Sequence, residues 1–177
     1  IKKNYEIKKG SDQRVEFAID LDEGLLPIDA KFPSALYDTY VKAAEKQDQN
    51  AKKEVDNALK AIKRSTKGNA KDINEKYMLK GVTIDFGVMF IPSESLMQLI
   101  DRLQEDTIER STKEQIFRDY RVLIMGPNSF AAFLISLNMG FKSIALNERA
   151  EEILHKFGKL EKEFRQFEGM TEELRDN

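Results

Sequence analysis

Three charged side chains near the start of the chain have types and spacing that suit phosphate chemistry: Glu16, Asp29 and Lys31. If Asp22 and Glu23 form the centre of a turn, the numbers of facing residues sum to 45, which places Glu16 opposite Asp29. Side chains two positions apart in a strand share a face, so Asp29 and Lys31 point the same way. Directly opposed residues have Cβ atoms roughly 4.5–5.5 Å apart. We therefore predict that two carboxylates and a lysine converge on one patch.

Two carboxylates this close repel each other unless a cation lies between them. Mg²⁺ prefers oxygen ligands and commonly uses one or two carboxylates together with waters and substrate phosphates. A lysine beside a metal-bound water can orient it or stabilise negative charge that develops on a phosphate. The pattern predicts a Mg²⁺ or Mn²⁺ site with Glu16 and Asp29 as metal ligands, and all three residues as the catalytic set. On spacing alone, a charged, solvent-facing side of a hairpin is the commoner explanation of such a short pattern.

The elements that must position these residues are strands. Alternation of apolar and polar residues predicts strands over 5–8, 14–21 and 25–29, bounded by glycine and aspartate. Val15, Phe17 and Ile19 would point into the core, on the side of the hairpin away from the charged patch. The first thirty residues therefore predict an antiparallel meander with one face on the core.

A basic helical stretch follows from Ser34. Apolar spacing indicates helix on both sides of residues 47–50, which interrupt it, so the stretch is either two helices or one kinked helix. Between residues 42 and 80 there are eleven Lys and Arg against six Asp and Glu. Such an excess usually marks a solvated helix face; a path for phosphates is the alternative.

Two β–α pairs come next, and they predict an α/β fold. Residues 82–91 read as a buried strand, and a helix follows through Leu103, with Ser93 as its N-cap. Residues 121–125 and the helix that follows repeat the pattern, which indicates a parallel element in the sheet. The connecting turn, 126–129, presents backbone N–H groups that could bind a phosphate, although strand-to-helix turns use the same residues structurally.

The last thirty residues carry a heptad pattern with only Thr171 out of place. This pattern predicts a long helix that packs on the body or self-associates as a coiled coil. We expect residues 1–147 to form the α/β domain and 148–177 a helical extension. The apolar positions are Ala150, Ile153, Phe157, Leu160, Phe164, Phe167 and Leu174.

Composition excludes several kinds of site. The 177 residues include no Cys and one His, which excludes disulfides, thiolate nucleophiles, Cys-ligated metal and His-based triads within this chain. His155 falls outside the heptad pattern, and we expect it to be exposed. No apolar run approaches the roughly 20 residues that span a bilayer, so we expect no membrane contact. The net charge of −2 excludes a globally basic nucleic-acid binder but not a local basic path.

Four blocks of sequence stand out together: RVEFAIDLDEGLLPIDAKFP (14–33), IDFGVMFIPSE (84–94), VLIMGPNSFAAFL (122–134) and MGFKSIALNERAEEI (139–153). In this order they resemble the RmuC family of bacterial proteins linked to DNA recombination. The resemblance implies a restriction-endonuclease-like core of the PD-(D/E)-x-K nuclease superfamily, DNA as partner, and a role in limiting DNA rearrangements. Because the chain starts without Met, we expect it to be part of a longer cytoplasmic protein, which the family often anchors through a preceding membrane segment or coiled coil.

Carried over by position, the family's two acidic positions fall on Glu16 and Asp29 and its lysine on Lys31. Pro-Asp is more usual at the first position, where this chain has Val15-Glu16. Glutamate keeps the charge but lengthens the arm by one methylene, which could move or weaken the metal. Three hypotheses follow: a metal-dependent DNA phosphodiester hydrolase, a non-catalytic nuclease-fold module that binds DNA or protein, and a coiled-coil scaffold.

Overall fold

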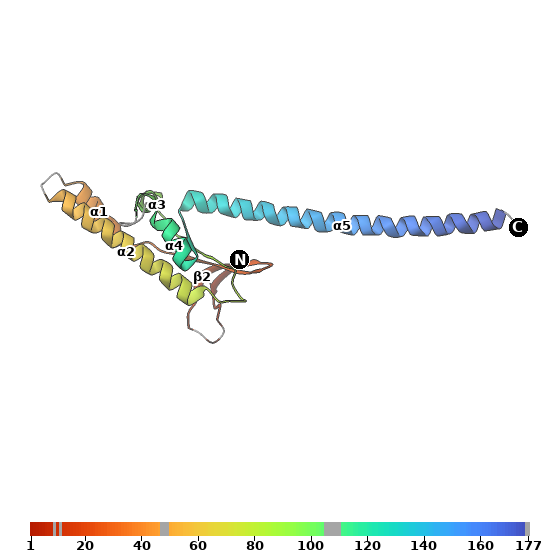
Figure 1. Cartoon of the computed structure of the whole chain (residues 1–177), viewed down its shortest axis with the longest axis horizontal. Coiled ribbons are helices and arrows are strands. Elements are labelled where there is room, and N and C mark those ends of the chain that lie inside the picture. Colours follow the sequence, from red (N-terminus) through yellow and green to blue (C-terminus); the bar gives the residue numbers. More distant parts are fainter. Residues whose placement is uncertain (9, 11, 47–49, 105–110, 176–177) are drawn as a thin grey trace. The chain divides into compact units, whose positions relative to one another are not determined.

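A mixed five-stranded sheet with flanking helices forms the body of the computed structural model (Figure 1). The structure describes residues 1–8, 10, 12–46, 50–104 and 111–175, and the side chains of these apart from 148, 157 and 160–175. The strand order is β1-β2-β3-β4-β5; the first two pairings are antiparallel and the last two parallel. This confirms an α/β fold with an N-terminal antiparallel meander. The strands are β1 (Lys2–Tyr5), β2 (Val15–Leu21), β3 (Gly24–Ala30), β4 (Gly87–Phe90) and β5 (Val122–Met125).

The β2–β3 hairpin has the predicted register. Phe17 pairs with Ile28, and Leu21 pairs with Gly24 across the turn, so facing residues sum to 45. Gly24 has a φ of +143°, and a Cβ there would lie 3.0 Å from the carbonyl oxygen of Val82. A larger residue at this position would therefore strain the turn that sets the register.

Burial within the hairpin differs from the prediction of a single buried face. The five central residues of β3, from Leu25 to Asp29, are all buried, because β3 is an interior strand between β2 and β4 and both of its faces are covered. The prediction that Phe17 points into the core was wrong: its side chain is 39% exposed, whereas neighbouring Ala18 is fully buried. Alternation alone did not show which strands lie inside the sheet.

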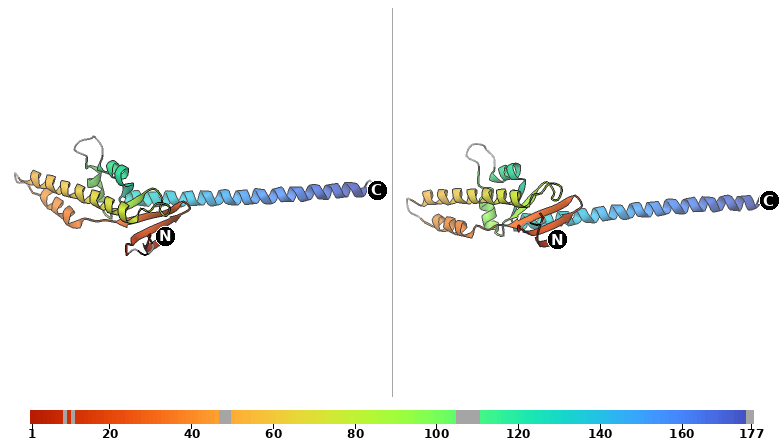
Figure 2. Two further views of the ribbon diagram at one scale, coloured as in Figure 1. Left: turned by 60° about the horizontal axis from the view of Figure 1, so that its bottom comes forward. Right: turned by 90° about the horizontal axis from the view of Figure 1, so that it is seen from below.

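Two helices, α1 (Ser34–Ala44) and α2 (Ala51–Tyr77), lie side by side (Figure 2). This confirms the two-helix alternative; residues 47–49 of the predicted interruption lie outside the described residues. At 1.5 Å per residue, the 27 residues of α2 extend roughly 40 Å. One face of α2 enters the main core through Ile62, Ala70 and Ile73.

Two shorter helices, α3 (Glu94–Asp101) and α4 (Thr112–Tyr120), complete the core. Ser93 caps α3 as predicted, since its Oγ accepts a hydrogen bond from the Leu96 N–H at 3.2 Å. The strand predicted over 82–91 is shorter: β4 covers only Gly87–Phe90, all paired with β5, and its last three residues also pair with β3. The preceding residues turn instead, with the N–H groups of Val82 and Thr83 both donating to the Leu79 carbonyl oxygen.

The last helix, α5 (Pro127–Arg175), is continuous and confirms the predicted long C-terminal helix. The chain divides into two compact units, Ile1–Phe130 and Ala131–Asn177, and the domain boundary expected at residue 148 stays a prediction. The heptad side chains at 157 and from 160 onward lie outside the described residues.

The first part of α5 bears on the expectation of no membrane contact, which stays a prediction. Pro127–Lys156 is long and apolar enough, by length and composition alone, to cross a bilayer, with a mean hydropathy of 1.4 over its most apolar window. The expectation had overlooked it because isolated polar residues such as Asn138 and Lys142 interrupt the apolar run. His155, as expected, is exposed.

Candidate functional site

Asp29 and Lys31 form the centre of the candidate site. Asp29 is near the end of β3, and Lys31 follows that strand directly. The Lys31 Nζ lies 2.6 Å from the Asp29 Oδ2, and the two side chains are 33% and 3% exposed. The prediction that they share a side is confirmed, but Asp29 is not part of a solvent-facing patch. It is a buried carboxylate with one cation at its open side.

The Asp29 carboxylate is incompletely satisfied. Its Oδ2 is buried and accepts no hydrogen bond from any residue that the structure describes. The contact with Lys31 is therefore an ion pair without hydrogen-bond geometry. A buried ionised oxygen that lacks a donor is destabilising unless another group meets it. The arrangement leaves a position at this oxygen for a further ligand.

Glu16 reaches the same strand from β2. Its side chain is exposed, and its Oε2 accepts a hydrogen bond from the Ala30 N–H at 3.0 Å. In the observed register, the next pair beyond Phe17 and Ile28 would be Glu16 and Asp29. Within the described part of the chain, no hydrogen bond or ion pair joins the Glu16 carboxylate to Asp29 or Lys31. The structure thus brings Glu16 to the neighbouring backbone group rather than to the other two side chains.

The end of α2 adds residues that the sequence did not single out. Half-buried Tyr77 packs against both hydrophobic clusters of the body. Burial raises the pKa of the Tyr77 hydroxyl; the charge of Asp29 raises it further, and Lys31 and Lys76 oppose this. Tyr77 lies four residues after buried Ile73 on the apolar face of α2. This helical spacing is the sequence feature that could have identified Tyr77 as a residue facing the core.

Lys76 also belongs to this end of α2. It makes a 2.8 Å ion pair with Asp72. This hydrogen-bonded contact raises the pKa of Lys76 and lowers the pKa of Asp72. Lys31 lowers the pKa of Asp72 as well, through its charge, so the end of α2 and the end of β3 share one electrostatic environment.

The donor set at β3 fits a hard divalent cation only in part. Carboxylate oxygens are the ligands that Mg²⁺ and Mn²⁺ prefer. The Asp29 Oδ2, which accepts no hydrogen bond from the described residues, is suited to the role of a metal ligand. Across the described ranges, however, no three acidic or histidine side chains gather as a metal-binding group. Two protein carboxylates would leave the remaining positions to water and substrate oxygens, as is common for Mg²⁺.

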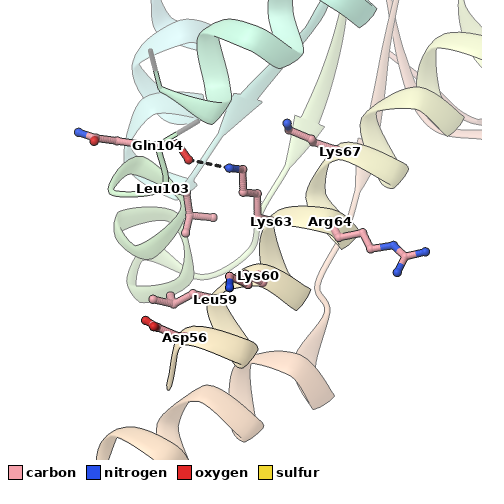
Figure 3. A pocket seen from close by; sticks show the side chains of 8 residues that line it. All are labelled: Asp56, Leu59, Lys60, Lys63, Arg64, Lys67, Leu103 and Gln104. Carbon is pink, nitrogen blue, oxygen red and sulfur yellow. Dashed lines mark hydrogen bonds between the residues drawn. The ribbon is translucent and has the colours of Figure 1, made fainter. Parts of the chain in front are cut away.

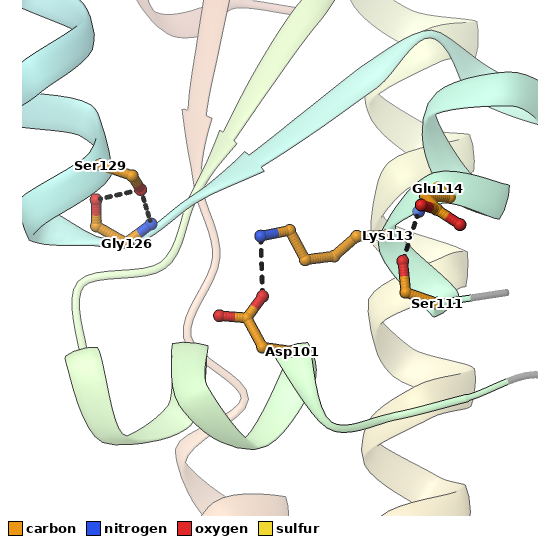
Figure 4. A network of polar contacts seen from close by, with 6 residues as sticks. All are labelled: Asp101, Ser111, Lys113, Glu114, Gly126 and Ser129. Atoms are coloured by element: carbon orange, nitrogen blue, oxygen red, sulfur yellow. Dashed lines mark hydrogen bonds and ion pairs between the residues drawn. The ribbon is translucent and has the colours of Figure 1, made fainter.

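The turn between β5 and α5 is already satisfied internally. The Gly126 N–H donates to the Ser129 Oγ at 3.0 Å, and that hydroxyl donates back to the Gly126 carbonyl oxygen at 3.2 Å (Figure 4). The Asn128 N–H faces the Glu94 Oε2 at 3.4 Å. A carboxylate at this position disfavours a phosphate, so the structural explanation of the turn is the better one. Asp85 is exposed and takes no part in the site.

Comparisons with known proteins agree on one family. The family model described as "RmuC family" matches residues 2–177. Two curated proteins of Xylella fastidiosa, from strains Temecula1 and 9a5c and both described as "DNA recombination protein RmuC homolog", are each 36% identical over 148 residues. The match covers 83% of this chain and 30% of each relative, so the chain spans about a third of their length. No solved structure matches significantly, and the restriction-endonuclease-like assignment stays a prediction.

Proposed function

The chain belongs to the RmuC family, and from that premise we propose that it hydrolyses DNA phosphodiester bonds with a divalent metal ion, as part of a DNA recombination protein. Its relatives are described as DNA recombination proteins, and this supplies the link to DNA. The observation that carries the chemistry is the buried Asp29 carboxylate, whose Oδ2 faces Lys31 and accepts no hydrogen bond from the residues that the structure describes.

Burial of Asp29 favours a functional role over a structural one. An ionised carboxylate in a protein interior is destabilising even when paired, and apolar replacements of buried ion pairs are often neutral or stabilising. In the described part of the chain, the Asp29 side chain caps no helix, and β3 is held by backbone pairing to both neighbouring strands. A carboxylate kept in such a position is a candidate ligand or catalytic group.

Each residue has a distinct role in the proposed site. Asp29 and Glu16 would hold Mg²⁺ or Mn²⁺, and the bound ion would supply an activated water and neutralise charge on the phosphate. Lys31, one-third exposed, lies where it can contact both the carboxylate and an incoming phosphate oxygen. Its ammonium group stabilises negative charge that develops there. Tyr77 and Lys76 add a hydroxyl and a second cation beside the site.

A cleavage assay tests the proposal. A labelled DNA duplex is incubated with the chain and Mg²⁺, Mn²⁺ or Ca²⁺, and with a longer form that includes the preceding residues. We expect Asp29→Asn and Lys31→Ala to reduce the rate by roughly 10²–10⁴. Asp20→Asn is the matched control, because Asp20 is an exposed carboxylate of the same hairpin, paired with Lys2. Equal cleavage by Lys31→Ala and the unaltered chain would contradict the proposed site.

A module that holds DNA without cutting it is the second candidate. Two observations favour it: the described residues hold no group of three metal-ligating side chains, and Glu16 already bonds the Ala30 backbone. Calorimetric titration with Mn²⁺ distinguishes the two candidates. Binding that Asp29→Asn abolishes supports the hydrolase, and DNA binding without any metal binding supports the module.

We also propose that α5 mediates self-association. Met139, Leu146 and Ile153 are spaced by seven residues, and each is more than half exposed. Apolar residues at heptad spacing on an exposed helix are typical of a coiled-coil interface. The same spacing continues in the sequence at residues 160, 167 and 174, which are Leu, Phe and Leu.

A further inference from the structure

A pocket that combines apolar, aromatic and cationic side chains lies at the end of β1, outside the proposed site. Its volume is about 580 Å³, within the range of pockets that bind small organic groups. A hollow beside α2, by contrast, is lined mostly by charged side chains of that helix (Figure 3). We call the first the β1 pocket, and the residues that give it its chemistry are Tyr5, Ile7, Lys8, Arg14, Leu79 and Val82.

Part of the lining of the β1 pocket is apolar. Ile7 is buried, Tyr5 and Leu79 are half-buried, and all three belong to one hydrophobic cluster of the body or pack against it. Val82 is 37% exposed, although its backbone N–H and carbonyl oxygen are both bonded, to Leu79 and Leu25. An apolar side chain left open inside a concave surface offers area that a ligand can cover.

The ring of Tyr5 is held in place from one side. The Lys2 Nζ lies 4.7 Å from the ring centroid, and it also pairs with Asp20 at 2.9 Å. One face of the ring is therefore occupied, while the side chain still lines the pocket. An aromatic ring fixed beside open apolar surface suits the flat face of a nucleobase, because bases of every kind stack on such rings.

Two exposed cations, Lys8 and Arg14, complete the β1 pocket. Among the described residues of the lining there is a single carboxylate, that of Glu6, and it accepts a hydrogen bond from the Gly10 N–H. Two cations thus face one carboxylate that a backbone donor already meets. This balance suits a phosphate, whose usual partners are Arg and Lys side chains.

The β1 pocket adjoins the proposed site through β2 and the end of α2. Arg14 is two residues before Glu16, so their Cα atoms are at most about 7 Å apart. Tyr77 packs against the same hydrophobic cluster as Tyr5. The charges of Asp29 and Glu16 both act on the Tyr77 hydroxyl. One nucleotide of an extended strand spans a similar length, so a strand with a phosphate at Glu16 would bring its next nucleotide to Arg14.

From this arrangement we propose that the β1 pocket holds an unpaired nucleotide of a DNA strand, next to the phosphate at the proposed site. The inference rests on the proposed function and names its substrate class, which is single-stranded DNA or a frayed strand end. The base stacks on Tyr5 and covers Val82. Arg14 contacts the phosphate on the far side of that base, and Lys8 contacts the one beyond it. A base inside the pocket has left the duplex stack, so unpaired DNA is favoured.

Binding in EDTA tests this inference separately from cleavage. The fluorescence anisotropy of a labelled single strand of about 12 nucleotides, and of the blunt duplex of the same length, is followed against protein. We expect the unaltered chain to bind the single strand roughly tenfold more tightly than the duplex. Tyr5→Leu removes the ring but keeps an apolar side chain, and it should abolish the preference. Tyr5→Phe keeps the ring and should retain it.

A charge variant tests the same pocket without changing its apolar part, and it decides the matter if Tyr5→Leu does not fold. Lys8→Gln/Arg14→Gln should reduce the salt-dependence slope for the single strand by about 1.4, or about 0.7 for each lost phosphate contact. Lys52→Gln/Lys53→Gln is the matched control, since it removes the same charge from two exposed lysines at the start of α2. Circular dichroism verifies that each variant is folded.

The outcomes separate this inference from the proposed function. Equal affinity for single strand and duplex, an unchanged preference in folded Tyr5→Leu, or equal slopes for the charge variant and its control would each overturn the inference alone. Displacement of the strand by thymidine monophosphate at the strand's own concentration would overturn the assignment to DNA in favour of a free nucleotide. Pocket-dependent binding without cleavage in Mg²⁺ or Mn²⁺ would overturn only the hydrolase.

Discussion

The Lys31 Nζ lies 2.6 Å from the Asp29 Oδ2, yet the lysine side chain is one-third exposed and the aspartate almost entirely buried. The lysine is therefore the part of the pair that solvent or a phosphate can reach. Asp29 depends on that single cation, because its Oδ2 receives no hydrogen bond from the described residues.

This dependence predicts an asymmetric double-mutant cycle. Lys31→Met leaves a buried carboxylate without its cation and should lower the free energy of unfolding by about 1–3 kcal/mol. Asp29→Asn alone should change it less, because the remaining lysine is partly solvated. The double variant Asp29→Asn/Lys31→Met should recover most of the loss, and urea denaturation measures all four proteins. Simple additivity of the two single effects would contradict the proposed coupling.

Tyr77 predicts a loss of stability at alkaline pH. Burial, aided by Asp29, raises the pKa of its hydroxyl above the usual value near 10. The folded state then holds the proton more tightly than the unfolded state does. The associated stability is fully present below about pH 10, and it is lost as pH rises through the folded-state pKa.

Thermal unfolding between pH 8 and 11.5 measures this loss. The melting temperature of the unaltered chain should fall more steeply above pH 10 than that of Tyr77→Phe, which keeps the ring and lacks the titrating group. Tyr120→Phe is the control, since it removes another partly buried tyrosine hydroxyl of the same core. Parallel curves of melting temperature against pH for the unaltered chain and Tyr77→Phe would contradict the prediction.

Two glycine-to-alanine changes should act in opposite directions. A Cβ on Gly126 would lie 2.7 Å from the Met97 Cγ and 3.0 Å from its Cβ, inside the core. We expect Gly126→Ala to destabilise the chain by about 1–3 kcal/mol through overpacking. Gly140 lies within α5 with nothing inside 4 Å, so Gly140→Ala should stabilise the helix by about 0.5–1 kcal/mol. Chemical denaturation followed by circular dichroism at 222 nm measures the direction of both changes in stability.

The heptad residues of α5 predict an oligomer. Sedimentation of the unaltered chain should show self-association at micromolar concentration, and Met139→Ser/Leu146→Ser/Ile153→Ser should be monomeric. The control changes three charged residues at the same spacing, as Lys142→Ser/Arg149→Ser/Lys156→Ser. A monomeric unaltered chain that binds lipid vesicles would instead favour membrane contact for this apolar segment.

The hairpin shows what the sequence could predict about the site. A two-residue turn and strict alternation determined the register, and the observed pairing of Phe17 with Ile28 agrees with it. The burial of Asp29 was not predictable in this way, because it depends on β4, which pairs with β3 on the side away from β2. Those contacts join residues far apart in the chain, and alternation describes only local geometry.

Tyr77 and the basic stretch of residues 42–80 illustrate the same limit. The basic excess of this stretch is visible in composition, but composition cannot show which group each lysine meets. Lys71 and Lys76 have carboxylates four residues away on α2, whereas Lys63 meets Gln104 only through the fold. Helix α4 was missed because its nine residues carry few apolar side chains, although the Ser111 cap was readable.

The strands lie in the sheet in the order in which they occur along the chain. As the polypeptide leaves the ribosome, each strand can therefore pair with one that has already been made, and none has to insert between two others. β3 gains its second neighbour, β4, only after α1 and α2 have been synthesised. The second flank of Asp29 is consequently covered only at the step that begins the parallel half of the sheet, before β5 adds to it.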